Sequence, residues 1–277
     1  MTFSVNTNMG AMVALQNLNN TSSQLQQTQN EVSTGLAISS AKDNAAVWAI
    51  AQNQRATSSS LNSVISSLQR GQSTVDVALS AGNSVSDLLT QMKALALSSA
   101  DTTLDTTSRA ALNDEFTSLR DQIGKVTSNA VFNGANMLES GGATVQALAN
   151  ADASSFITVQ AQDLSLGGTV LGSAVSSTAT INTATGAASM ILDLNTAIAS
   201  VSSALGKLGT GDKALASHLT FIQDLQNTID AGVGNLVDAD LAKESANLQA
   251  LQTKQQLGIQ ALSIANQSSS ILLGLFK

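Results

Sequence analysis

The clearest regularity in the chain lies in residues 61–96, which read LNSVISSLQRGQSTVDVALSAGNSVSDLLTQMKALA. Apolar or small residues recur there every seven positions, and a second set follows three residues after the first. The first set is Leu61, Leu68, Val75, Gly82, Leu89 and Ala96, and the second is Val64, Gly71, Ala78, Val85 and Met92. This spacing is the a/d repeat of a coiled coil. Val47 and Ile50 begin it earlier, so we predict one helix from about residue 45 to 97, about 80 Å long.

Two glycines interrupt the apolar seam of this predicted helix. Gly71 and Gly82 each cost about 1 kcal/mol relative to alanine inside a helix. We interpret them as positions where a neighbouring backbone or side chain comes unusually close.

Shorter heptad patterns flank this segment. On its N-terminal side, residues that step by seven predict a helix that stops at Gly35, and residues 34–44 lack a period and are predicted to be a connector. On its C-terminal side, residues 101–108 form a polar break with several N-cap candidates. The helix after this short break should fold back antiparallel on the preceding one. The seams are Ala11, Leu18, Leu25 and Val32, and then Leu112, Phe116, Leu119, Ile123 and Val126.

The character of the sequence changes between Gly141 and Gly186. Gly, Ser, Thr and Ala dominate this region, and charged residues nearly vanish. Asn133-Gly134 just before it is a turn signal, and Phe156–Val159 has the composition of a strand. We predict a small central β region with exposed loops.

The helical period then returns over residues 191–236. It falters at Gly209-Thr210-Gly211-Asp212 and resumes in the same phase. A loop between two helices and one long, locally disturbed helix are about equally good interpretations of that interruption. The apolar positions are Ile191, Leu194, Ile198, Val201, Leu205 and Leu208, and then Leu215, Leu219, Ile222, Ile229, Val233 and Leu236.

A last helix follows Asp238-Ala239-Asp240, whose carboxylates suit a helix N-terminus. Its apolar residues keep sevenfold spacing with one slip: Leu241 and Leu248, then Leu257, Ile264 and Ile271. The whole order predicts a mainly α fold. Long antiparallel helical rods form a coiled-coil-like bundle with a small central β region, and the N- and C-terminal helices pair.

Both ends of the chain lack charge. No Lys, Arg, Asp, Glu or His occurs in residues 1–30 or 255–276, although both stretches carry spaced apolar residues. Membrane-active amphipathic helices usually carry Lys or Arg on their polar face, whereas this face is Gln, Asn, Ser and Thr. We therefore expect these helices to be buried against each other and against copies of themselves.

The overall composition excludes several classes of function. The net charge of −7, with only scattered basic residues, argues against a nucleic-acid partner. Cysteine is absent, which excludes disulfides and thiolate chemistry, and proline is absent, as in a chain built from uninterrupted helices. We expect no secretory signal peptide, no transmembrane helix and no membrane insertion.

No catalytic, cofactor-binding or metal site is predicted. His218 is the one histidine, and its helical position makes a structural or surface role far better supported than a role as general base. Asp238, Asp240 and Glu244 lack the rest of a calcium-loop pattern, so helix capping is the better explanation. Hydrolase, phosphate-loop and dinucleotide motifs are also missing. We therefore predict that the protein is not an enzyme and uses no cofactor.

Several spaced motifs closely resemble bacterial flagellin. They lie in the family's order and cover roughly residues 1–138 and 187–277. At the N-terminal side they are Val5-Asn6-Thr7-Asn8, Val32-Ser33-Thr34-Gly35-Leu36 and Ser40-Ala41-Lys42-Asp43-Asn44-Ala45-Ala46, followed by Phe132-Asn133-Gly134. At the C-terminal side they are Val237-Asp238-Ala239-Asp240-Leu241-Ala242 and Ile264-Ala265-Asn266-Gln267.

The resemblance implies a structural subunit that polymerises into the flagellar filament for swimming. It would make residues 1–46 an inner-core helix with a spoke-like connector, 47–138 the N-terminal rods of an outer layer and 139–186 the small β and loop region. Residues 187–236 would be the C-terminal rod and 237–277 the C-terminal inner-core helix. The predicted polymerisation seams are Leu18, Leu25, Val32, Leu257, Ile264 and Ile271.

The resemblance also implies partners and a location. Subunits of the family leave the cell unfolded through the flagellar type III export apparatus, with a chaperone, and add at the filament tip. Hook-associated and cap proteins would be neighbours in an extracellular filament. An alternative is a hook–filament junction or cap-like adaptor, which shares the terminal helices.

Two departures from larger flagellins stand out. Only about 50 residues separate the two matching regions, which implies a minimal flagellin without large variable outer domains. In the patch that an animal innate immune receptor senses, one basic residue and a Glu are missing from residues 89–95, although Glu115 remains. With Gln91 and Leu95 in this patch, we predict weak recognition.

Overall fold

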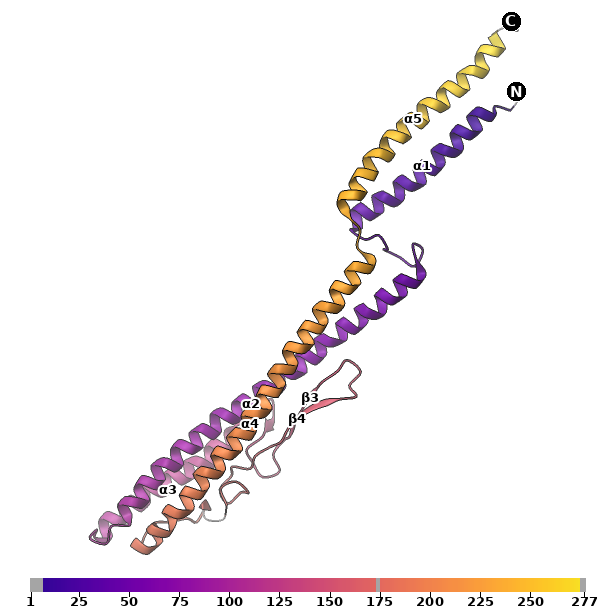
Figure 1. The fold of residues 1–277 in the computed structure, drawn as a ribbon. Helices are drawn as coiled ribbons and strands as arrows, with labels where there is room; N and C mark the ends of the chain where they lie inside the picture. The colour runs from indigo at the N-terminus through magenta and orange to yellow at the C-terminus, as the bar shows by residue number, and fades with distance from the viewer. Residues whose placement is uncertain (1–6, 173–174, 275–277) are drawn as a thin grey trace. The chain divides into compact units, whose positions relative to one another are not determined.

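The computed structural model describes residues 7–172 and 175–274, with side chains as far as residue 267 (Figure 1). The chain divides into two compact units. One is Thr57–Asn227, and the other contains both ends of the chain, up to Ala56 and from Thr228. We describe them as the central unit and the terminal unit.

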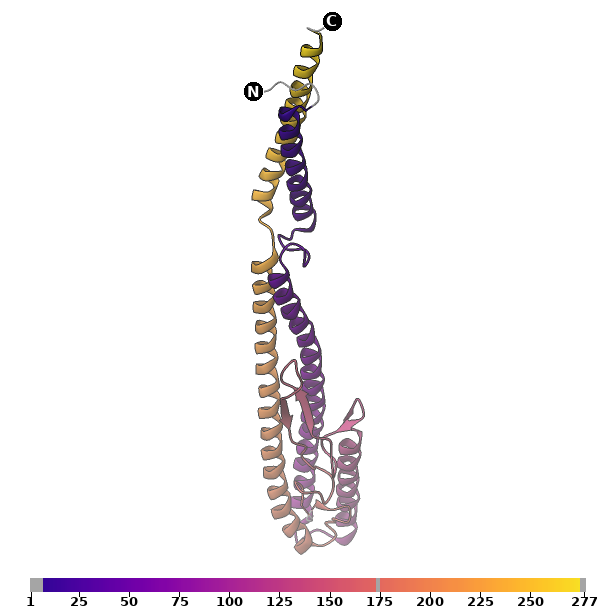
Figure 2. The same cartoon turned by 90° about the vertical axis from the view of Figure 1, so that its right-hand side faces the viewer.

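Three long helices build the central unit: α2 (Ala45–Ser99), α3 (Thr106–Asn129) and α4 (Ala184–Val237). The first twelve residues of α2 (45–56) and the last ten of α4 (228–237) belong to the terminal unit. Within the central unit, α2 and α4 run side by side in both views (Figures 1 and 2). Every seam residue from Leu61 to Ala96 is buried, which confirms the a/d pattern there, whereas Ile50, predicted to begin it, is 51% exposed. The mainly α fold with long packed rods is therefore as expected.

The two seam glycines of α2 mark close approaches, as predicted. A Cβ atom at Gly82 would lie 2.5 Å from Cδ2 of Leu205 in α4. A Cβ atom at Gly71 would lie 3.1 Å from Cγ1 of Val145. Larger residues would push these neighbours away, so the helix-propensity cost of glycine is offset by tighter packing.

A short turn reverses the chain between α2 and α3. Asp105 caps α3 by accepting a hydrogen bond from the amide of Ser108 at 2.8 Å. The buried guanidinium of Arg109 donates to the carbonyl oxygens of Ser99, Asp101 and Leu104. These bonds fix the turn and give the buried guanidinium hydrogen-bond acceptors.

The α4 helix settles the open question about Gly209–Asp212. It is one continuous helix through both glycines, and Leu208, Leu215 and Ile222 stay buried on one side. The alternative of two helices joined by a loop was wrong. By length and composition, α4 is the one helix of the described part that could cross a membrane, but an apolar helix of a soluble bundle meets the same criterion.

Two hairpins make up the β structure. β1 (Val131–Phe132) pairs with β2 (Ala135–Asn136) around Asn133-Gly134, whose φ values of 48° and 80° match the predicted tight turn. β3 (Val145–Leu148) pairs antiparallel with β4 (Phe156–Val159), with Val145 opposite Val159 and Leu148 opposite Phe156. The predicted strand at 156–159 is confirmed.

The terminal unit pairs α1 (Met9–Thr34) with α5 (Leu241–Gly274), which lie side by side in Figures 1 and 2. α1 ends at Gly35, whose φ of 71° is left-handed and whose amide donates to the Glu31 carbonyl. The expected pairing of the terminal helices and the expected stop at Gly35 are both confirmed.

A small apolar cluster holds the connector in the terminal unit. Ala51 of α2 packs there with Val233 and Val237 of α4, and with partly buried Leu36, Ile38, Val47 and Ile229. The amides of Ala37 and Ile38 donate to the Val237 carbonyl, and the amide of Ala239 donates to that of Gly35. The compact units consequently divide near residues 56 and 228, whereas the filament layers were predicted to divide at 46/47 and 236/237. The layer assignment concerns a filament, so it stays a prediction.

Candidate assembly surface

The facing sides of α1 and α5 are lined by half-buried residues. Leu18, Leu25 and Val32 of α1 are half-buried, and a Cβ atom at Gly258 of α5 would lie 3.2 Å from Cδ1 of Leu18. Near the other end of the pair, the side-chain amide (Nδ2) of Asn8 donates to the Ala265 carbonyl at 2.7 Å. The three predicted α1 seam residues thus lie on the side that α5 covers.

The inward side of α5 follows a heptad register without a slip. Its partly or fully buried residues after the first turns are Leu248, Leu251, Gln255, Gly258, Leu262 and Ala265. They step by three and four, as a continuous a/d pattern does. The expected slip at Leu257 was therefore wrong as a description of the helix pair. Large apolar side chains do not mark the inward side throughout α5, because Gln255, Gly258 and Ala265 hold three of its inward positions.

The outward sides of the same two helices carry large apolar side chains. Leu257 is 58% exposed and Ile264 is 68% exposed on α5, so these two predicted seam residues face away from the intramolecular contact. The side chain of Ile271 lies outside the described residues. Within the charge-free residues 9–30 of α1 and 255–267 of α5, the exposed set is Met9, Met12, Val13, Leu15, Leu257, Ile259 and Ile264. Exposed apolar side chains on helix segments without charge are typical of a surface that packs against another chain.

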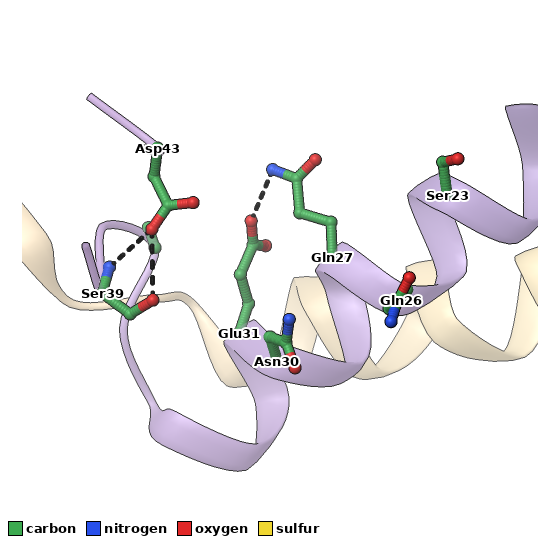
Figure 3. A pocket seen from close by; sticks show the side chains of 8 residues that line it. Ser23, Gln26, Gln27, Asn30, Glu31, Ser39 and Asp43 are labelled. Atoms are coloured by element: carbon green, nitrogen blue, oxygen red, sulfur yellow. Dashed lines mark hydrogen bonds between the residues drawn. The ribbon is translucent and has the colours of Figure 1, made fainter. Parts of the chain in front are cut away.

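The hollow between α1 and the connector is polar. It has a volume of about 270 Å³ and is lined from α1 by Ser23, Gln26, Gln27, Asn30 and Glu31, and from the connector by Ala37, Ser39 and Asp43 (Figure 3). Gln27 Nε2 donates to Glu31 Oε1 at 2.9 Å. The Ser39 hydroxyl donates to the Asp43 carboxylate, and no group in this hollow is arranged as a nucleophile with a base.

Asp43 organises the connector. One carboxylate oxygen accepts from the amides of Ser39 and Ser40 at 3.0 and 2.9 Å and from both hydroxyls at 3.1 and 3.2 Å. The Ser40 amide first, and then the Ser39 bonds and the Ser40 hydroxyl, hold the pKa of Asp43 below its ordinary value despite some desolvation. The carboxylate is therefore a structural anchor.

Comparison with known proteins matches this chain at both ends. The family model of the bacterial flagellin N-terminal helical region matches residues 5–144, and that of the C-terminal helical region matches residues 191–276. The chain belongs to the bacterial flagellin family. Flagellins are structural proteins, and this one is a subunit of the extracellular flagellar filament.

Individual relatives cover the chain from end to end. Flagellin FljM of Caulobacter vibrioides is 56% identical over 99% of this chain and 98% of its own length. A flagellin of Brucella melitensis is 36% identical over 99% of each chain. A Bacillus cereus flagellin crystal structure covers 55% of this chain and 86% of its own, at 23% identity and a TM-score of 0.49. The full-length matches to flagellins favour the filament subunit over a junction or cap-like adaptor, and they fit the short length of a minimal flagellin.

The residues singled out for chemistry serve structural purposes in this flagellin. His218 Nε2 lies 2.7 Å from the Ala149 carbonyl, so it donates to the loop between β3 and β4. Asp240 accepts from the amides of Ala242 and Lys243, both at 3.1 Å, and so caps α5 as predicted. Within residues 7–172 and 175–267, no three His, Cys, Asp or Glu side chains gather to hold a metal ion.

The three residues of the predicted receptor patch belong to the central unit. Gln91 is exposed and Leu95 half-buried on α2, and Glu115 is exposed on α3. Exposure makes them available to a partner, and the expected weak recognition stays a prediction.

Proposed function

We propose that the outward faces of α1 and α5 join this flagellin to its neighbours in the filament. The observation that carries the proposal is the set of seven large, exposed apolar side chains in the charge-free stretches of the two helices. In this arrangement, Leu18, Leu25 and Val32 close the pair within one subunit. Leu257 and Ile264, with Ile271 further along, make contacts between subunits. Residues 1–46 and 237–277 then form the inner layer, and 47–138 and 187–236 form the outer rods around it.

The energetics favour assembly over a free monomer. Burying a large apolar side chain that was fully exposed contributes about 1.5–3 kcal/mol. Seven side chains that are half to two-thirds exposed therefore offer enough to offset the entropy lost when subunits dock. The absence of charge in residues 1–30 also avoids stacking like charges along a repeating, poorly hydrated wall.

A pair of aspartate substitutions separates contacts within the subunit from contacts between subunits. Ile264→Asp should leave the monomer helical, since Ile264 is mostly exposed, yet raise the critical concentration for seeded polymerisation at least tenfold. Leu25→Asp should loosen the α1–α5 pair in the monomer itself, seen as faster amide hydrogen exchange. Ile264→Leu is the matched control and should polymerise normally. Normal filaments from Ile264→Asp would refute the proposed contact.

We infer that the chain reaches the filament through the flagellar type III export apparatus. A chaperone would keep the terminal helices apart before export, and hook-associated and cap proteins would flank the finished filament. The lack of cysteine and proline supports this route, since neither disulfide formation nor slow prolyl isomerisation would delay folding at the tip. Loss of secreted subunit in cells without the export apparatus is the expected result, and unchanged secretion would exclude the route.

We also propose that the animal receptor for flagellin recognises this protein weakly. Gln91 and Leu95 leave the exposed patch with one basic residue fewer and without one glutamate, while Glu115 is retained. A reporter-cell response below that of a strongly activating flagellin is expected, and an equal response would overturn the proposal.

A further inference from the structure

The central unit contains a second polar hollow, formed where two hairpins meet α2. Its volume is about 230 Å³. The lining comes from Ser67, Arg70, Gly71 and Thr74 of α2, from Phe132, Asn133 and Ala135 of the first hairpin, and from Val145 and Gln146 of β3. No acidic residue lines it.

Three polar side chains around this hollow, those of Ser67, Arg70 and Gln146, can donate hydrogen bonds to an entering group. Ser67 Oγ accepts the amide of Leu148 at 3.1 Å, so its own proton remains available. The Arg70 guanidinium makes no hydrogen bond or ion pair with any described residue. The side chain of Gln146 adds an amide donor. A planar guanidinium flanked by a hydroxyl and an amide matches the acceptor pattern of a carboxylate.

Arg70 differs in this respect from two other arginines of the central unit. Arg109 donates to three carbonyl oxygens of its own chain, and Arg120 donates to the Ala179 carbonyl and pairs with Asp121. Both of those side chains hold local structure together. Arg70 is exposed and makes no such side-chain bond to the described residues, so its charge is accessible to a partner.

The walls of the hollow are fixed in advance. β3 packs so tightly on α2 that a Cβ atom at Gly71 would lie 3.1 Å from Val145 and 3.3 Å from Ala147. The first hairpin is tied to the end of α3 by Asn136, whose side-chain Nδ2 donates to the Thr127 carbonyl at 2.8 Å. A preformed site loses little entropy when an acidic group enters.

We propose that this hollow, the Arg70 pocket, binds a carboxylate side chain from a second copy of the chain. The inference rests on the proposed filament assembly, because only a polymer brings copies together at a fixed geometry. Charge supports this occupant, since each copy carries 19 acidic against 12 basic residues. Asp87, Asp114 and Glu115 are exposed in the central unit and bond no other described residue through their side chains. A contact of this kind would repeat at every subunit and fix the register between outer rods.

Polymerisation thermodynamics give the first test. Arg70→Ala should raise the critical concentration about three- to tenfold, and the increase should shrink at 1 M NaCl, where the Debye length is about 3 Å. Lys207→Ala removes the same charge from an exposed position outside the pocket and should have little effect. Equal behaviour of the two variants, or an unchanged critical concentration in Arg70→Ala, would overturn the proposal. Failure of the unsubstituted chain to polymerise would instead count against the filament assembly itself.

Cross-linking identifies the occupant directly. In filaments of Arg70→Lys, a carbodiimide should join the new amine to a carboxylate in contact with it. Filaments grown from mixed ¹⁵N-labelled and unlabelled subunits should give hybrid cross-linked peptides by mass spectrometry, and dilute monomer should give none. A cross-link found only within one chain, or no cross-link at position 70, would exclude a partner carboxylate in this pocket.

Discussion

Gly211 of α4 lies against Val159 of β4 so closely that a Cβ atom at Gly211 would be 2.5 Å from Val159 Cγ1. The β3–β4 hairpin therefore packs on the backbone of α4 itself. Gly209, two residues earlier, has nothing within 4 Å of its Cβ position. The two glycines look alike in the sequence but differ in packing.

Substituting these two glycines should have opposite effects. Gly211→Ala gains helix propensity but forces the stiff, β-branched Val159 to move, which costs about 1–3 kcal/mol. Gly209→Ala gains helix propensity without a clash and should stabilise by about 0.5–1 kcal/mol. Urea unfolding of the monomer measures both. A Gly211→Ala variant as stable as Gly209→Ala would contradict the close packing.

The continuous α4 helix shows what the phase of a heptad repeat can predict from sequence. The kept phase across Gly209–Asp212 was visible in the sequence, and it correctly allowed one helix. The reason for Gly211 was not visible, because it depends on Val159, which lies some fifty residues away in the chain. Local pattern gives the helix, whereas the contact that requires glycine is tertiary.

For the α1–α5 helix pair, the sequence predicted the character of the helices but not which side of α5 faces inward. Residues 1–30 and 255–276 were recognisable as uncharged and amphipathic. Which residues of α5 face inward was not recognisable, because Gly258 and Ala265 fill inward positions that composition alone gives to Leu257 and Ile264. A continued sevenfold step from Leu248 to Gln255 and Leu262 was the signal that could have found the register.

The buried Arg109 should contribute much more to the stability of the fold than an exposed arginine does. Arg109→Ala removes a donor to three carbonyl oxygens and leaves them to find water in a tight turn, so we expect a loss of about 2–3 kcal/mol. Arg55→Ala is the control, since Arg55 is exposed on α2 and should change stability by less than about 0.5 kcal/mol. Thermal unfolding measures the difference, and similar losses in both variants would argue against the clamp.

Acid should release the connector through Asp43. Its pKa is lowered in the folded chain, so its bonds stabilise the connector above the unfolded pKa of about 3.9 and are lost as pH falls through the lower folded value. The amide signals of Ser39 and Ser40 in NMR spectra should shift together, with a midpoint below pH 3.9. Asp43→Asn removes the titrating group, so its Ser39 and Ser40 signals should not show this transition. The same titration in Asp43→Asn would assign it to another group.

The ionised carboxylate of Asp212 should destabilise the fold, whereas that of Asp43 stabilises it. Burial first, and then the charge of Asp76, raise its pKa, and a hydrogen bond from Gln72 only partly opposes this. One of its oxygens is buried without a partner. A raised folded pKa means that the carboxylate destabilises the fold increasingly as pH rises above the unfolded value of about 3.9. Asp212→Asn should therefore raise the urea midpoint at pH 7 and lose this advantage near pH 3.5. Asp76→Asn should gain less, because the larger cause, desolvation of Asp212, remains. An equal gain for Asp212→Asn at both pH values would show that shape, not charge, is responsible.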